Sequence, residues 1–326
     1  MGSGMTMHRK GGLPIEDPLV SIVIITWNRR TEVLETINSI LRQKYARYEI
    51  ILVDNGSVDN TVEAVLQSYP QVNVIPLDRN LGVSARNMAI RVAHGEIVFC
   101  LDSDASLGEH SIENVVAKFR SEPQVGVINS KIVSAITQQI DHVAGWSYSE
   151  RDLEDQDKEF LSFSFSEGGA AFRREVFDKA GYFWEPLFFG GEGLEFSLRV
   201  LDAGYDILYF PDSIVYHRAA DSSRMSGRQL DSALFRNYLC IYLVRFPWWL
   251  LGLFFPARIC VSLVRGMRHG YFPQMLGTLY DFVKRIPLLL QERHPIRNET
   301  AVHYVKLMRQ HGPLRWDLIT WLKYKT

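Results

Sequence analysis

Two apolar runs with a helical pattern between them decide the fold: SIVIIT at residues 21–26, a helical pattern over 31–41, and YEIILVD at 48–54. The alternation continues with the runs VNVIPL (72–77) and EIVFCLD (96–102) and with helical patterns over 61–67, 83–93 and 112–119. Their β-branched residues and flanking turn residues favour strands for these short runs. Strands that alternate with helices predict an α/β fold with a mainly parallel sheet and helices on both faces.

Composition narrows the class of protein. The chain has 326 residues, of which 47% are hydrophobic and 22% charged, as in globular proteins. A formal net charge of -1 gives no overall field for nucleic acid, so nucleic acid is excluded as a partner and any anion needs a local site. Cys100, Cys240 and Cys260 lie far apart, which predicts buried, reduced thiols and the cytoplasm.

The ends of the chain differ from its middle. Residues 1–18 are polar or Gly-rich, and we expect a cloning scar and a flexible N-terminus without a secretory signal. Residues 19–220 carry the α/β pattern, and residues 221–326 form a loop followed by a helical region. The longest apolar run, residues 246–257, is shorter than the roughly 20 residues that a spanning helix needs.

Polar residues follow each of the first four predicted strands. They are TWNR at 26–29, DNGS at 54–57, DRNLG at 78–82 and DSD at 102–104. In open α/β sheets ligands bind beyond the carboxyl ends of the strands. The four segments therefore predict one polar crevice.

Two carboxylates, Asp102 and Asp104, flank Ser103 at the end of a very apolar strand. Carboxylates there are costly unless a cation compensates them, and Mg²⁺ or Mn²⁺ bound together with substrate phosphates would do so. A solvated turn is the alternative. Asp54 suits a hydrogen bond to a nucleobase or a ribose, or else forms an Asx-turn. In NLGVSARN, residues 80–87, helix N–H groups and Arg86 suit a phosphate, although a surface arginine is the alternative.

The ordered set TWNR, VDNGSVDNT, RNLGVSARN and LDSD resembles the nucleotide-sugar domain of family 2 glycosyltransferases, especially the bacterial rhamnosyltransferase-like branch. The resemblance continues through FRREVFDKAGYF (172–183) to YFPDSIVYH (209–217). It implies a GT-A fold and transfer, with inversion, of a sugar from a nucleoside diphosphate such as UDP or dTDP. It also implies a Mg²⁺ or Mn²⁺ cofactor and a role in cell-surface polysaccharide or glycan synthesis.

The resemblance also implies roles for individual residues. The expected donor-binding residues are Thr26, Asn28, Asp54, Asn80, Arg86, Asp102 and Ser103. The expected metal ligands are Asp104, Asp102 and His217, where a strand-end histidine with a structural role is the alternative for the last.

The general base is the point at which the sequence departs from the family. The segment GGEGLEFSLR, residues 190–199, matches the family's Glu-Asp-x-Asp/Glu-x-x-x-Arg pattern at all positions but one. Gly193 stands where the family usually has the aspartate that acts as the general base. Glu192 is the first candidate for the base and Glu195 the second, although Glu195 is also placed to pair with Arg199. Gly193 leaves a second interpretation open, a catalytically impaired protein that only binds nucleotide sugars.

The acceptor side is less defined. Gly169 and Ala170 resemble the small-residue floor of the family's acceptor site, and Trp146 is either a platform for a sugar ring or a core residue. Residues 238–280 combine Trp and Phe with regularly spaced arginines, which favours helices lying on the inner face of the cell membrane. A homo-oligomer interface or a core helix pair is the alternative. A membrane location suits a lipid-linked or saccharide acceptor.

One other class of enzyme has the same α/β arrangement but is disfavoured by the sequence. A nicotinamide or flavin oxidoreductase would carry a Gly-x-Gly-x-x-Gly turn after the first strand, and this chain has TWNRR there.

Overall fold

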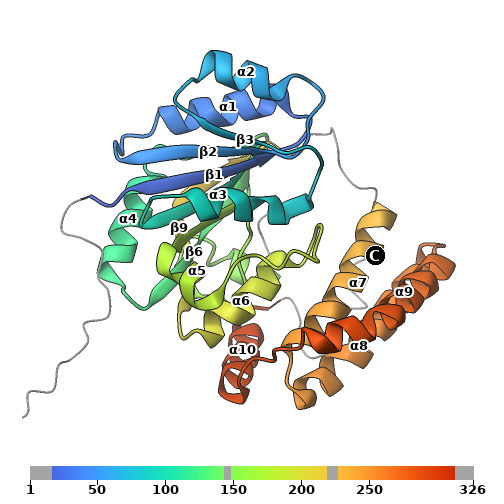
Figure 1. Cartoon of the computed structure of the whole chain (residues 1–326). Coiled ribbons are helices and arrows are strands. Elements are labelled where there is room, and N and C mark those ends of the chain that lie inside the picture. Colours follow the sequence, from blue (N-terminus) through green and yellow to red (C-terminus); the bar gives the residue numbers. More distant parts are fainter. Residues whose placement is uncertain (1–16, 143–147, 219–226, 313–326) are drawn as a thin grey trace, which may run out of the picture.

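The computed structural model describes residues 17–142, 148–218 and 227–312 (Figure 1). Within them one sheet runs in the order β3-β2-β1-β4-β8-β6-β9-β5, with β7 paired to β9. The strands are β1 Val20–Thr26, β2 Tyr48–Asp54, β3 Asn73–Pro76, β4 Ile97–Asp102, β5 Ala105–Leu107, β6 Val125–Ser134, β7 Phe160–Leu161, β8 Gly169–Arg173 and β9 Asp206–His217. The expected N-terminal tail up to residue 16 and Trp146 fall outside the described residues.

The first four strands form the parallel half that the sequence predicts. β1 pairs in parallel with β2 and β4, and β2 pairs in parallel with β3. Thr26 therefore lies directly beside Asp54, and Ile25 beside Asp102. The polar segments after these strands consequently meet at one edge of the sheet.

The second half of the sheet is mixed. β8 runs antiparallel to both β4 and β6, β6 and β9 are parallel, and the short β5 and β7 run antiparallel to β9. β9 brings its last residue, His217, next to Ala105 and so to the end of β4.

Helices cover both faces of the sheet (Figure 1). One face packs its alternate residues, such as Ile22 and Phe99, against α1, α2 and α4. The other face, with Val23 and Cys100, packs against α3, α5, α6 and α10. These helices are α1 Arg30–Leu41, α2 Thr61–Ser68, α3 Arg86–Val92 after a 3₁₀ turn at Gly82–Ala85, α4 Ser111–Ser121, α5 Arg174–Ala180, α6 Glu192–Asp202 and α10 Asn298–His311.

Three further helices form their own apolar cluster beside the sheet: α7 Gly227–Arg245, α8 Trp248–Arg268 and α9 Phe272–Gln291. α7 also contacts α6, and α10 returns to pack on α6. The C-terminal region is thus joined to the sheet at both of its ends, while α8 and α9 project away from it (Figure 1).

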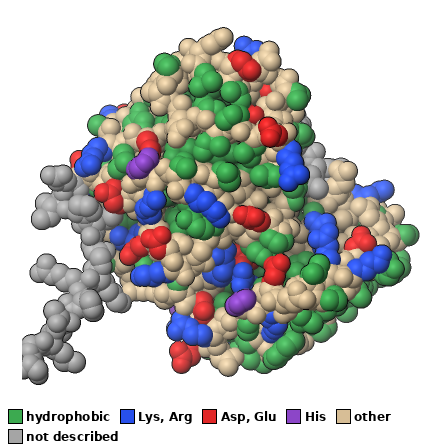
Figure 2. All heavy atoms as spheres, viewed as in Figure 1, with side chains coloured by type: hydrophobic (Ala, Val, Ile, Leu, Met, Phe, Trp, Pro, Cys, Tyr) green, Lys and Arg blue, Asp and Glu red, His purple; other side chains and the backbone are tan. Residues whose placement is uncertain are grey.

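Two expectations for this region were wrong. α8 continues through Pro256 and Arg258 to 21 residues, with a mean hydropathy of 1.5 in its most apolar window, and is long and apolar enough to cross a membrane by length and composition alone. Cys260, on this helix, is exposed, whereas Cys100 and Cys240 are buried. In Figure 2, which has the same view as Figure 1, hydrophobic side chains line the lower right edge where α8 and α9 lie, and Lys and Arg side chains occur above them.

Candidate active site

A cleft of about 610 Å³ opens at the carboxyl edge of the parallel strands. Eight of the predicted site residues line it: Thr26, Asn80, Arg86, Asp102, Ser103, Asp104, Glu192 and His217. Five others do not line it: Asn28, Asp54, Glu195, Gly169 and Ala170. The cleft is completed by residues 166–168 before β8 and by residues 188–191 before α6, of which only 190 and 191 belong to a motif noted in the sequence.

The tips of β1 and β2 carry buried polar atoms without partners. Thr26 Oγ1 and Asp54 Oδ1 make no hydrogen bond, and both residues are 2% exposed. The other carboxyl oxygen of Asp54 accepts the backbone N–H of Ser57 at 2.9 Å, which is the turn considered from the sequence. Orphaned buried polar atoms are rare and suit a ligand, so this corner can accept hydrogen bonds from a base or a sugar hydroxyl.

Asn28 ties two loops together. Its backbone N–H donates to Ser57 Oγ at 2.8 Å, and its Oδ1 accepts the backbone N–H of Val58 at 2.8 Å. It adopts a φ of 51°, which asparagine tolerates better than most residues. Asn28 therefore shapes the loop beside the cleft and does not face into it.

The turn before α3 is held by asparagines and a tightly packed glycine. Asn80 Oδ1 accepts hydrogen bonds from Asn55 Nδ2 at 2.9 Å and from the backbone N–H of Gly82 at 2.8 Å. Gly82 has a φ of +70°, and a Cβ there would collide with the carbonyl oxygen of Phe188. The backbone of the 188–191 segment thus closes directly on this turn.

Arg86, the first residue of α3, is 1% exposed and forms an ion pair with Asp102. Its Nε and Nη1 atoms have no hydrogen-bond partner. The Asp102 side chain is 39% exposed at the cleft surface. A buried guanidinium with unused donors is suited to an anionic oxygen in the cleft.

Asp104 lies between two cationic groups. Its Oδ2 is 2.8 Å from Arg29 Nη1 and 3.6 Å from His217 Nε2, while His217 Nδ1 is 2.7 Å from Asp141 Oδ2. Burial alone would raise the pKa of Asp104, but the hydrogen bond from His217 and the charges of Arg29 and His217 lower it to about 2. Burial would lower the pKa of His217, but Asp104 and Asp141 outweigh it and raise this pKa. Asp104 is therefore an anion at neutral pH.

The floor of the cleft carries two carboxyl groups, Glu167 and Glu192. Glu192 is 4% exposed, begins α6, and accepts the backbone N–H of Gly190 at 2.6 Å. Burial and the negative charge of Glu167 raise the pKa of Glu192 to about 8. Burial also raises the pKa of Glu167, against the opposing charge of Arg86. A carboxyl group whose pKa is raised in this way can hold or take up a proton at a higher pH than an ordinary glutamate.

The family model described as Glycosyl transferase family 2 matches residues 21–181. The chain belongs to the family 2 glycosyltransferases. It is 26% identical to the glycosyltransferase AglE of Haloferax volcanii, over 65% of this chain and 71% of that protein. Seven further curated relatives match over only 27–52% of their own length.

Solved structures share the GT-A fold of this glycosyltransferase. Residues 1–349 of S. aureus TarS in complex with UDP-GlcNAc match with a TM-score of 0.58 and 20% identity, over 82% of each chain. The mannosyltransferase PcManGT from Pyrobaculum calidifontis, in complex with GDP-Man and Mn²⁺, matches with a TM-score of 0.52 and 18% identity, over 96% of this chain and 81% of that one.

The residues of this glycosyltransferase fit a divalent ion that is held mainly by its substrate. Asp102, Asp104 and His217 offer the oxygen and imidazole donors that Mn²⁺ accepts. Among the described residues no three of His, Cys, Asp or Glu gather closely enough to hold an ion alone. A site with few protein ligands is the usual arrangement when phosphate oxygens supply the rest.

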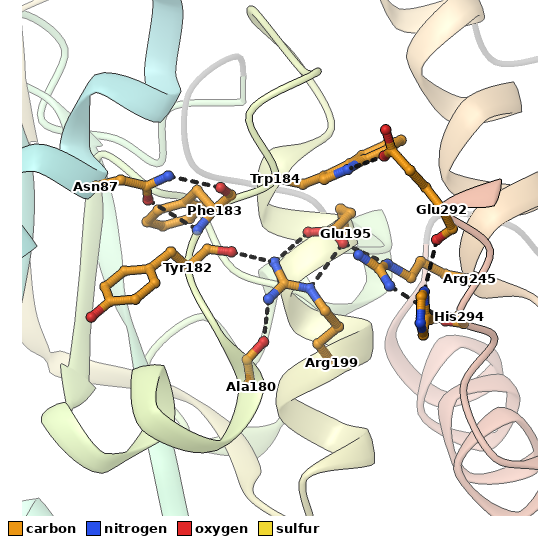
Figure 3. Close-up of polar contacts among 10 residues, drawn as sticks. All are labelled: Asn87, Ala180, Tyr182, Phe183, Trp184, Glu195, Arg199, Arg245, Glu292 and His294. Carbon is orange, nitrogen blue, oxygen red and sulfur yellow. Dashed lines mark hydrogen bonds and ion pairs between the residues drawn. The ribbon is translucent and has the colours of Figure 1, made fainter. Parts of the chain in front are cut away.

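Glu195, the second candidate for the general base, lies outside the cleft, between Arg199 and Arg245 (Figure 3). It is fully buried behind the cleft, 2.6 Å from Arg199 Nη2 and 2.7 Å from Arg245 Nε. The pairing with Arg199 is the structural alternative considered from the sequence, and Arg245 joins it from α7. Glu195 thus links α6 to the C-terminal helices.

Two charged residues of the cleft, Arg29 and Glu167, were not among the predicted site residues. Arg29 lies in the TWNR segment, and its position directly after the predicted strand end was the available signal. Glu167 lies two residues before Gly169, which was expected with Ala170 to form an acceptor floor. Gly169 and Ala170 do not line the cleft, because they pair with Leu101 and Cys100 inside the sheet, whereas Gly168 does line it.

Proposed function

We propose that this glycosyltransferase moves a sugar, with inversion, from a nucleoside diphosphate to a saccharide or lipid-linked acceptor in cell-surface polysaccharide or glycan synthesis. The observation that carries the proposal is the pair Asp102 and Asp104 at the edge of β4, each held by an arginine in one cleft with the unpartnered Thr26. The cleft therefore offers carboxylates for a metal ion, arginine donors for a diphosphate and a free hydroxyl for a nucleoside.

Each part of the cleft has a role in this proposal. Thr26 binds the base or the ribose through its free oxygen, Asp54 lies directly beside it at the tip of β2, and Asn80 keeps the neighbouring loop in place. The unused donors of Arg86 bind diphosphate oxygens. Asp102, Asp104 and His217 hold Mg²⁺ or Mn²⁺, which stabilises the departing diphosphate when bound. A floor carboxylate, for which the sequence favours Glu192, takes the proton of the acceptor hydroxyl.

UDP is the first choice of nucleotide, because the TarS relative binds UDP-GlcNAc, and dTDP is the second. The reading as a protein that only binds nucleotide sugars is disfavoured, because the loss of a side chain at Gly193 leaves two carboxyl groups on the cleft floor.

A thermal-shift screen tests the proposal. UDP, dTDP and their sugars are added with and without Mn²⁺, and a ligand that binds the folded state raises the melting temperature according to RT ln(1 + [L]/Kd). We expect a shift with UDP or dTDP that grows with Mn²⁺, and release of nucleoside diphosphate from one of the sugars. No shift with any of them in either condition would refute the proposal.

We further propose that α8 and α9 rest on the anionic inner surface of the cell membrane. Trp248 is 66% exposed, Tyr280 61% and Leu288 64%. The two helices carry three arginines and no acid on α8, and one lysine, one arginine and one aspartate on α9. Exposed aromatic residues beside a net positive charge suit an interface with anionic lipid.

Vesicle sedimentation tests this surface. Wild-type protein is expected to sediment with vesicles that contain phosphatidylglycerol and less with phosphatidylcholine alone. Leu288→Glu should weaken the binding, and Ile136→Glu, at a residue 81% exposed elsewhere, should not. Absence of vesicle binding, together with a dimer in solution that Leu288→Glu disrupts, would instead identify a homo-oligomer interface.

A further inference from the structure

Position 193 has neither a side chain nor room for one. Gly193 is the second residue of α6. A Cβ built there would lie 2.7 Å from Oε1 of Glu167 and would collide with the carbonyl oxygen of Phe165. The space that a side chain at position 193 would enter is therefore taken by the carbonyl group of Phe165 and by the carboxyl group of Glu167.

Glu167 reaches this space from a different segment of the chain. It belongs to the segment 166–168 that leads into β8, and it is partly exposed to the cleft. The next residue, Gly168, packs so closely on Asp102 that a Cβ there would overlap its carboxylate. The segment is thus fixed against the end of β4, and the position of Glu167 follows from it.

The first turn of α6 supports the Glu167 carboxylate. The backbone N–H of Gly193, one of the free donors at the start of the helix, lowers the pKa of Glu167 and so favours its charged form. The positive charge of Arg86 acts on the same carboxylate. Glu192, by comparison, is more buried and already accepts the backbone N–H of Gly190.

We propose that Glu167 is the general base of this enzyme and supplies, from the loop before β8, the carboxylate that position 193 lacks. The inference rests on the proposed function and names its proton acceptor. Glu192 is then a positioning residue whose carboxyl group lies beside that of Glu167.

The step balances as a direct displacement. The acceptor oxygen forms a bond to the anomeric carbon while the bond from that carbon to the diphosphate oxygen breaks, and the electron pair leaves with the nucleoside diphosphate. The acceptor proton passes to the carboxylate of Glu167 and from there to solvent. General-base assistance of this kind contributes about 10²–10⁴ in rate.

The test compares Glu167→Gln, Glu192→Gln and Glu185→Gln by the release of UDP from UDP-GlcNAc or dTDP from dTDP-rhamnose, with water as the acceptor. Glu185 is a control because its side chain is 70% exposed outside the cleft. We expect Glu167→Gln to lower the rate by about 10²–10⁴, Glu192→Gln by less, and Glu185→Gln not to change it. The affinity for UDP with Mn²⁺ should stay within about twofold in Glu167→Gln, since the base does not hold the nucleotide.

Azide separates chemistry from structure, because it attacks as an anion and has no proton to give up. Adding sodium azide should restore nucleotide release in Glu167→Gln, with formation of the glycosyl azide. A rate for Glu167→Gln within threefold of wild type, or an equal loss with water and with azide, would overturn the inference. If the wild type releases no nucleotide from any donor, the proposed function itself fails, which is a separate result.

Discussion

Replacing Glu195 by glutamine removes a negative charge that is completely buried between two cations. The Glu195 side chain is 0% exposed, and those of Arg199 and Arg245 are 15% and 12% exposed. Removing one partner of a buried ion pair leaves uncompensated charge and costs about 3–5 kcal/mol. At about 2 °C per kcal/mol for a chain of this size, the melting temperature should fall by about 6–10 °C.

The assay is thermal unfolding, followed by nucleotide release per folded molecule at a temperature where both proteins are folded. Glu109→Gln is the matched control, because Glu109 pairs with Lys44 at 2.8 Å but both side chains are more than half exposed. Exposed pairs contribute little, so this variant should melt with the wild type. An unchanged melting temperature combined with lost turnover in Glu195→Gln would refute the structural role. Glu195 would then again be a candidate for the general base.

Three more predictions concern the cleft and its walls. Asp104→Ala should abolish the Mn²⁺-dependent part of UDP affinity in calorimetry, and equal enhancement by Mn²⁺ in both proteins would contradict this. Glu192→Gln should melt above the wild type at pH 8 but close to it at pH 5. The folded pKa of about 8 exceeds the unfolded value of 4.5, so wild-type stability falls as pH rises between them, by up to about 1.4 kcal/mol per pH unit. Gly82→Ala should lower the urea midpoint more than Gly204→Ala, because both have positive φ but only Gly82 abuts the Phe188 carbonyl; equal losses would reject the clash.

The donor half of the cleft could be predicted because its information is local. Apolar runs such as residues 21–26 and 48–54 specify buried strands, and parallel pairing then brings their ends to one edge. The polar residues that follow these strands, including Thr26 and Asp104, could be placed without knowing any other contact.

The floor could not be predicted, because it depends on contacts between distant segments. Glu195 is paired with Arg245, which lies 50 residues further along the chain, and the sequence around Glu195 does not predict that contact. Glu167 meets Gly193 only because β8 runs antiparallel between β4 and β6. The extent of α8 was missed because Arg258 ended the apolar run, although the helix continues through it to Arg268.

The carbonyl of Phe165 makes the glycine at position 193 hard to reverse. Restoring aspartate there would first require the backbone around Phe165 to retreat, and removing the Glu167 side chain would not open that space. A variant of this chain would accept an aspartate at position 193 only after the loop that contains Phe165 had been remodelled. Relatives with glycine at this position are therefore expected to keep an acidic residue at the position of Glu167, a coupling that an alignment of such sequences would reveal.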